Sequence, residues 1–260
     1  MTAGRLADLT WAEVRAAAAA GAVAVVPAGS LEQHGPHLPV RTDTALVGAV
    51  AEAAAARLPS DVPAVLAPVL WLGASHHHLP FFALSLDERT YVEIAVQIGC
   101  SLAQAGFRRV FFLNGHGGNA APLRLAVGEI ARRQPGALTA CAEYWALAAA
   151  ALRAERSTGT GGAGHACEIE TSLLLHLAPA AVRPGPHASR IPDLPPLFAR
   201  DLLDPGPVAL GVAWERLTPD GTLGDPTAAS PDKGRRMFEA CAQAAAEAIV
   251  AFARLELPPA

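Results

Sequence analysis

Three segments of this chain concentrate side chains that proteins use to bind metal ions. In the first segment Glu32 and His34 are two residues apart, and Asp43 follows them closely. Residues i and i+2 of an extended segment face the same side, so Glu32 and His34 can reach one ion. Asp43 taken alone is explained equally well as the N-cap of a helix. The combination of two carboxylates with an imidazole nevertheless favours a metal site.

The second segment, NGHGGN at 114–119, follows the apolar run RVFFL at 109–113. The run predicts a buried strand. The glycines after it allow a tight turn that presents His116 at the end of that strand. A strand followed by a glycine-rich loop and a helix also resembles a phosphate-binding arrangement. Because no GK[ST] sequence follows, a P-loop is disfavoured.

The third segment begins at His165 and contains two glutamates. His165 and Glu168 are three residues apart, so on a helix they can share a face. Glu168 and Glu170 point in different directions on a helix, so we expect at most one of them to reach a shared site. The preceding run at 159–164 formally matches the dinucleotide pattern GxGxxG. That interpretation is rejected, because the residues before the run look helical and Pro184 stands where an acid is needed.

Other residues are candidates for substrate contact. Ser75 and His78 lie in a loop-like segment at 73–88, and we predict that both line a substrate pocket. Trp145 follows a predicted strand and is the third residue expected there, although an aromatic at this place is equally well explained as part of the core. The four cysteines are widely spaced and contain no CxxC pair, which disfavours a disulfide framework and a cysteine zinc site.

The elements that must position these residues alternate between strands and helices, which favours an α/β domain with a mainly parallel sheet. Sites in such sheets lie beyond the carboxyl ends of the strands, which is where the metal-binding segments are expected. We expect one domain over 1–260, with mostly loops in the Pro- and Gly-rich stretch 179–230. Strands are predicted at 22–27, within 62–72, at 109–113 and at 138–143. Helices are predicted at 10–20, 43–58, 89–105, 168–177 and 231–255, and a further helix follows the NGHGGN segment and ends at about 133.

Composition excludes several classes of protein. With 260 residues, 52% of them hydrophobic and 17% charged, the chain can bury a sizeable core and is not expected to be disordered. Its net charge of −4 and the absence of a basic run argue against nucleic-acid binding. The longest apolar stretch, 16–28, contains Gly21 and Pro27 and is too short to span a bilayer. The N-terminus has no apolar signal-peptide region, so a cytoplasmic location is predicted.

The motifs together resemble the creatininase (creatinine amidohydrolase) family. The resemblance rests on GSLEQHGPHLP at 29–39 with TDT at 42–44, NGHGGN at 114–119 and ETS at 170–172, in the family's order. It extends from about Thr10 to Phe252. It implies a three-layer α/β sandwich around a mainly parallel sheet, a binuclear metal centre and a homohexamer.

The resemblance also implies a ligand set. Glu32, His34 and His116 correspond to family ligands, and Asp43 corresponds to the aspartate that bridges both metals. Creatininase itself takes a further glutamate two residues after the NGH histidine, where this chain has Gly118. Relatives with NGHGGN instead have a glutamate just before the ETS motif. We therefore predict Glu168 as the fifth ligand of two divalent ions, which are zinc, manganese or iron.

The implied activity is hydrolysis of a C–N bond in an amide or cyclic amide of a small molecule. In such a centre a hydroxide that bridges two ions about 3.5–4 Å apart attacks the carbonyl group. We predict that His165 serves as the general acid or base. Creatininase has a tryptophan shortly before the matching histidine, whereas this chain has threonine, glycine and alanine there. That difference argues against creatinine itself as the substrate.

Three other functions remain open. Some family members are peptidases that trim a modified peptide during maturation of a redox cofactor, as in mycofactocin synthesis. A metal-binding protein without turnover is a second possibility, against which the additional His165 argues. A nucleotide-binding protein that uses GTGGAG at 159–164 is the third.

Overall fold

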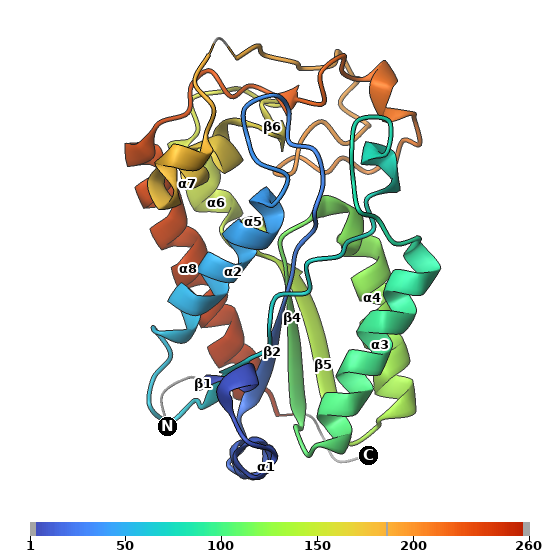
Figure 1. Cartoon of the computed structure of the whole chain (residues 1–260), viewed down its shortest axis with the longest axis vertical. Helices are drawn as coiled ribbons and strands as arrows, with labels where there is room; N and C mark the ends of the chain where they lie inside the picture. The colour runs from blue at the N-terminus through green and yellow to red at the C-terminus, as the bar shows by residue number, and fades with distance from the viewer. Residues whose placement is uncertain (1–3, 186, 257–260) are drawn as a thin grey trace.

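The computed structural model describes residues 4–185 and 187–256, and its centre is a single five-stranded sheet (Figure 1). The strands lie in the order β1-β3-β2-β4-β5, and every neighbouring pair is parallel. The predicted parallel sheet is therefore confirmed. The strands are β1 (Gly4–Arg5), β2 (Val23–Ala28), β3 (Ala64–Leu66), β4 (Arg109–Asn114) and β5 (Leu138–Glu143).

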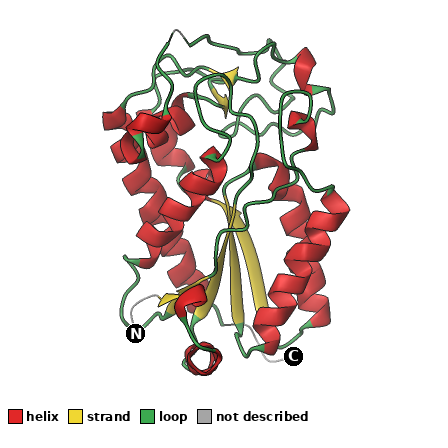
Figure 2. Cartoon of the chain, viewed as in Figure 1, coloured by secondary structure: helices red, strands yellow, loops and turns green. Residues whose placement is uncertain are grey.

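Helices cover both faces of the sheet, which gives the three layers expected (Figure 2). Helices α2 and α5 to α8 lie on one face, and α3 and α4 lie on the other (Figure 1). Each α/β crossover returns the chain to the same end of the sheet, as parallel strands require. The helices are α1 (Trp11–Ala19), α2 (Thr42–Ala55), α3 (Glu88–Gln104), α4 (Ala120–Arg133), α5 (Tyr144–Leu147), α6 (Ala149–Glu155), α7 (Glu168–Leu177) and α8 (Pro231–Ala253).

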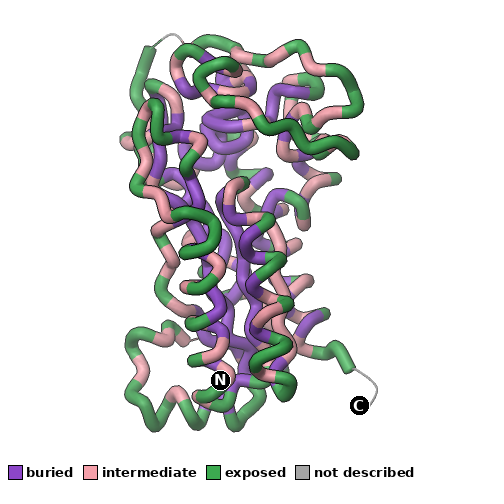
Figure 3. The backbone as a smooth tube through the Cα atoms, turned by 90° about the vertical axis from the view of Figure 1, so that its right-hand side faces the viewer, coloured by how far each residue is buried: buried purple, intermediate pink, exposed green. Residues whose placement is uncertain are grey.

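The inner strands are buried on both faces, and their side chains alternate between two cores. Val25 of β2 belongs to the core on the α2 and α8 side, whereas Val26 belongs to the core on the α3 and α4 side. Phe111 and Phe112 of β4 divide in the same way. A strand buried on both faces must be apolar throughout, which is why these runs were recognisable in the sequence. Figure 3 shows the buried backbone concentrated along this central layer.

Long loops gather beyond the carboxyl ends of the strands, at the top of Figure 1. Among them lies a small antiparallel pair, β6 (Ala163–His165) with β7 (Leu223–Gly224). We expected a glycine-rich loop at 157–164 and mostly loops over 179–230. Such short strands have no periodic apolar pattern, because contacts distant in sequence determine their pairing. No helix in the described residues is both long enough and apolar enough to cross a membrane.

Replacing Phe112 by alanine should strongly destabilise the fold. Phe112 is 0% exposed in the core beneath α3 and α4, and truncation of such a ring costs about 3–5 kcal/mol of unfolding free energy. The matched control is Leu125→Ala on α4, where the side chain is 68% exposed and the expected change is within about 0.5 kcal/mol. Urea denaturation measures both values, and a small effect of Phe112→Ala would contradict the assigned core.

Candidate metal centre

Two carboxylates and an imidazole meet where β2 and β4 end. Glu32 follows β2, His116 follows β4, and Asp43 lies in the first turn of α2. The Nδ1 atom of His116 is 3.1 Å from Oε1 of Glu32 and 3.1 Å from Oδ2 of Asp43. The N-cap of α2 is Arg41 rather than Asp43, so the simple capping explanation of Asp43 does not apply. These residues form a group that can hold a metal ion.

A second group shares Asp43 with the first. The Nε2 atom of His34 is 3.0 Å from Oδ1 of Asp43 and 3.7 Å from Oε1 of Glu170. The two carboxylate oxygens of Asp43 therefore face two different histidines. A third group, of Glu32, His34 and His165, overlaps both. His34 presents only one nitrogen to these carboxylates, so it can serve one group at a time.

Backbone carbonyls orient the imidazole rings toward the carboxylates. The Nδ1–H of His34 donates to the carbonyl oxygen of Glu32 at 3.2 Å, and the Nε2–H of His116 donates to that of Ala74 at 3.2 Å. The Nε2–H of His165 donates to the carbonyl of Gln33 at 2.7 Å. In each ring the opposite nitrogen faces the acidic groups. Metal-binding histidines are held in this way, because the second nitrogen fixes the tautomer.

Two buried oxygen atoms show that the donor set fits a metal ion. Oε1 of Glu32 and Oδ2 of Asp43 have no hydrogen-bond partner of acceptable geometry, although His116 Nδ1 lies 3.1 Å from each. Buried carboxylate oxygens without partners are costly. Two atoms that bind the same ion, each at about 2.0–2.2 Å from it, lie about as far apart as Nδ1 of His116 and these oxygens. The mixture of carboxylates and imidazoles suits a divalent ion such as zinc or manganese.

The charges of the centre compensate one another. Burial alone would raise the pKa of Glu32, but the charge and contact of His116 hold it well below its usual value. Burial alone would lower the pKa of His34, but Asp43 and Glu170 raise it well above its usual value. Without a metal ion, protonated imidazoles therefore balance the carboxylates. A divalent cation would take over that role and release these protons.

The structure does not bring Glu168, the predicted fifth ligand, into any of the candidate metal groups. Glu168 is buried, but its carboxylate forms an ion pair with Lys233 of α8 and accepts hydrogen bonds from the backbone of Ser157 and Thr158. Glu170 lies in the metal group instead. Its Oε2 accepts from the backbone N–H of Cys167 at the start of α7, while its Oε1 faces His34.

The helical spacing that suggested a shared face for His165 and Glu168 does not hold, although the helix begins where it was predicted. The prediction placed His165 and Glu168 on one helical face, but His165 belongs to β6 and α7 begins only at Glu168. Between them, Ala166 adopts a positive φ of 50°, so helical spacing does not apply. One signal for Glu170 was available: a glutamate at the third helical position commonly caps the helix start, which turns it back toward the preceding loop.

Gly118 has no space for the glutamate that creatininase carries at that position. A Cβ atom there would lie 2.1 Å from the carbonyl oxygen of Ala74 and 2.5 Å from Nε2 of His116. That carbonyl is the same one that orients His116. In the candidate groups the third carboxylate comes from Glu170 of α7 rather than from this loop.

Two predicted substrate-contacting residues and the predicted acid or base do lie at the centre. Ser75 Oγ is 3.2 Å from Nε2 of His116, and His78 Nε2 is 3.0 Å from Oε1 of Glu32. His165 Nδ1 is 3.8 Å from the same Glu32 oxygen. The structure thus brings all three beside the ligand groups.

Trp145 is placed differently from the pocket position predicted for it. It is buried in the core on the α2 and α8 side and meets Tyr144 edge-on, with ring centroids 5.2 Å apart. This placement agrees with the alternative interpretation of Trp145 as a core aromatic.

Sequence reasoning missed Trp214, which lies in a short 3-10 turn, Trp214–Arg216. The turn belongs to the Pro- and Gly-rich stretch, which offered no periodicity from which to predict a contact. The side chain is partly buried and lies outside the histidines of the centre. Its ring centroid is 4.6–5.7 Å from those of His78, His77 and His165.

Comparison with known proteins agrees with this geometry. The family model Creatininase, described as creatinine amidohydrolase, matches residues 7–249. The chain belongs to the creatininase family. Among curated family relatives, the mycofactocin precursor peptide peptidase of Mycobacterium tuberculosis is 37% identical over 228 residues, which are 83% of this chain and 80% of that protein. Creatinine amidohydrolase of Pseudomonas putida is 31% identical over 271 residues, covering 97% and 96% of the two chains.

Solved creatininases share the fold. A tryptophan-to-phenylalanine variant of creatininase superposes with a TM-score of 0.76 and 28% identity, over 94% of this chain and 96% of that one. A further variant, described as Zn–Zn type, gives 0.75 with 27% identity over the same shares. A manganese form gives 0.73 with 27% identity, over 96% and 98%. The predicted family and the three-layer α/β fold are therefore confirmed.

Glu170→Gln should remove one metal ion from the centre. The glutamine amide would keep the size of the side chain but lose the charge that faces His34, whereas Glu168 contacts Lys233 instead. After saturation with Zn²⁺ and desalting, elemental analysis should find one ion per chain fewer in Glu170→Gln than in the wild type. Equal metal content in Glu170→Gln and the wild type would show that Glu170 is not a ligand.

Proposed function

We propose that this creatininase-family chain is an amidohydrolase that cleaves a C–N bond with two divalent metal ions. The first ion would be held by Glu32, Asp43 and His116, and the second by His34, Asp43 and Glu170. The observation that supports this proposal most is the position of Asp43, because each of its oxygens faces a different histidine. A carboxylate so placed is suited to serve both ions.

The relatives indicate which metal is suitable. Solved creatininases are described as a Zn–Zn type and as a manganese form, and the ligands of this chain suit either. When bound, such ions polarise a carbonyl group and activate water near neutral pH. The homohexamer implied by the family and the cytoplasmic location predicted from the N-terminal sequence stay predictions.

His165 is the proposed general base and acid. Its Nε2–H is committed to the carbonyl of Gln33, so Nδ1 is the nitrogen that faces Glu32. Burial, together with the neighbouring positive charges of His34 and His78, lowers the pKa of His165 well below its usual value. The ring is therefore neutral at pH 7 and can accept a proton at Nδ1. The same nitrogen can then return that proton to the departing amine.

The substrate is an amide of either a small molecule or a peptide. The second possibility is favoured by the relative that is named a mycofactocin precursor peptide peptidase, at 37% identity. Creatinine amidohydrolase at 31% identity supports a small cyclic amide. Ser75 and His78 remain the proposed contacts for the substrate, and Trp214 with His77 adds an aromatic surface beside them.

Metal analysis combined with a substrate panel tests this function. The purified protein should contain close to two Zn²⁺ or Mn²⁺ ions per chain and should hydrolyse some member of a panel of cyclic amides, linear amides and short peptides. Asp43→Ala should remain folded by circular dichroism but lose both ions and all activity, because it removes the shared carboxylate. A wild-type protein without metal, or a fully active Asp43→Ala variant, would overturn the proposal.

His165→Ala should separate proton transfer from metal binding. Loss of a general acid or base lowers kcat by about 10²–10⁴-fold, while the ligands Glu32, His34 and Asp43 stay in place. Metal content and kcat are measured on the same preparation, with the best substrate of the panel. If the metal disappears together with the activity, His165 is a ligand, as its place in the third group would allow.

A further inference from the structure

The carboxylate of Glu168 is fully buried and completely paired, although it lies outside the metal groups. Its two oxygens accept hydrogen bonds from the backbone N–H groups of Ser157 and Thr158 at 2.9 Å each. The hydroxyl of Thr158 donates to it at 2.6 Å, and Lys233 donates to Oε1. A buried carboxylate with this many donors is held in one position.

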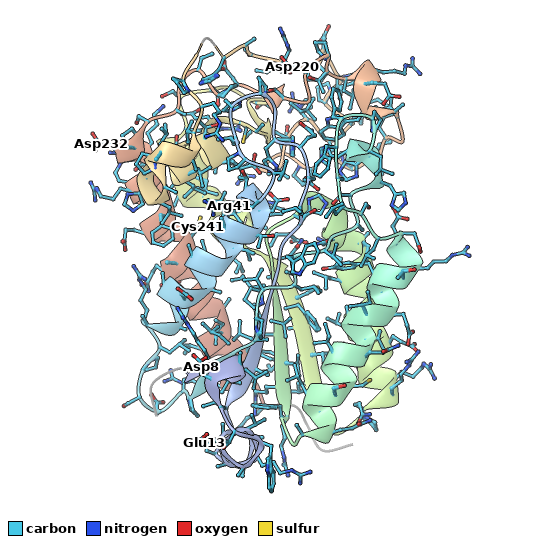
Figure 4. All side chains as sticks on the ribbon, in the orientation of Figure 1. Asp8, Glu13, Arg41, Asp220, Asp232 and Cys241 are labelled. Atoms are coloured by element: carbon cyan, nitrogen blue, oxygen red, sulfur yellow. The ribbon has the colours of Figure 1, made fainter. Side chains whose placement is uncertain are left out.

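Lys233 is the only lysine in the chain, and it serves Glu168. Its ammonium group also donates to Oγ of Ser157 at 2.7 Å and to the carbonyl of Ala228 at 2.7 Å. All three protons are therefore used, and the side chain is only 16% exposed. In Figure 4 the neighbouring Asp232 marks this start of α8, close to α7.

The ion pair of Glu168 and Lys233 joins three segments that are distant in sequence: the loop at 157–158, the start of α7 and the start of α8. Helices α7 and α8 approach each other closely here. A Cβ atom on Gly234, next to Lys233, would lie 1.8 Å from the carbonyl oxygen of Ser172. Ser172 Oγ in turn accepts from the backbone N–H of Ser230, the N-cap of α8. The first turn of α7 is thus fixed against α8.

The same turn carries residues of the metal centre. Glu170 is two residues after Glu168, and His165 is three residues before it. Between His165 and Glu168, Ala166 has a φ of 50°. Residues other than glycine adopt this left-handed conformation only when their surroundings impose it. Glu168 is the first charged residue after Ala166 in the sequence, and it pairs with Lys233. A contact that holds Glu168 is therefore placed to position Glu170, which lies in the same helical turn.

We propose that the Glu168–Lys233 pair is a positioning clamp for the metal centre. Lys233 touches no ligand atom; it holds the start of α7 so that Glu170 faces His34 and Asp43. The clamp thereby sets the affinity of the ion that Glu170 binds, and it leaves the group of Glu32, Asp43 and His116 unaffected. This inference rests on the two-ion function proposed above.

Lys233→Met tests the clamp by metal titration. Mutation of a partner outside the ligand shell weakens metal binding by about 10–100-fold. We expect a loss of this size for the ion that Glu170→Gln removes, and a change of less than about 3-fold for the other ion. Lys233→Arg keeps the charge and should retain most of the affinity. Unchanged affinity of both ions in folded Lys233→Met, or equal weakening of both, would overturn the proposal.

Two further variants separate positioning from other effects. Arg236→Met removes an ion pair with Glu155 that also joins α8 to α6 but lies at the surface, and it should leave both affinities unchanged. The double variant Glu168→Gln with Lys233→Met leaves no unpaired buried charge. If the clamp positions Glu170, the double variant still has a weakened affinity for the ion that Glu170 binds. Recovery of wild-type affinity would instead assign the effect to the unpaired charge and overturn the proposal.

Amine labelling tests the clamp without metal. Because Lys233 is the only lysine, acetylation by a water-soluble succinimidyl ester can be followed at that residue by peptide mapping. The folded metal-free wild type should acetylate Lys233 at least about 10-fold more slowly than Glu168→Gln, since its amine is paired and buried. Rapid acetylation in the wild type would overturn the clamp even if two ions bind. A wild type that binds no ion would overturn the two-ion function and, with it, the assigned role of the clamp.

Discussion

The buried carboxylates Glu32, Asp43 and Glu170 impose the strongest constraint on this molecule. Each is at most 6% exposed, and charges of one sign at this depth are stable only beside compensating positive charge. His34 and His116 supply part of it, and their rings are locked by backbone carbonyls. The loops around the centre must therefore bring compensating charges together as well as bury apolar side chains.

A rigid platform is required to hold such a group together. The central strands are buried on both faces, and their pairing extends from Ala24 opposite Val110 to Ala28 opposite Asn114. The ends of β2 and β4 are therefore fixed relative to each other, and Glu32 and His116 follow directly from them. Asp43 and Glu170 come from helix starts on one face of the sheet. The precision of the centre derives from regular elements, while the loops complete it.

The sequence predicted the parts that local patterns determine. Apolar runs located β2 and β4, and the first two motifs singled out Glu32, His34, Asp43 and His116, whose side chains the structure brings together. Glu170 was missed, because the turn at Ala166 follows a strand whose pairing partner, β7, is distant in the sequence. Trp214 was missed for a related reason, since the stretch around it is ordered by tertiary contacts and has no periodicity of its own. The polar partners of Glu168 likewise become visible only in three dimensions.

The shared position of Asp43 has a consequence for the order in which the centre can assemble during synthesis of the chain. The group of Glu32, Asp43 and His116 is complete within the first half of the sequence, which also contains β2 and β4. The group that includes Glu170 must wait for α7 and, for its support, for α8 near the other end. A nascent chain would therefore present one set of ligands long before the second exists. Full metal loading would then be a late event that reports completion of the fold.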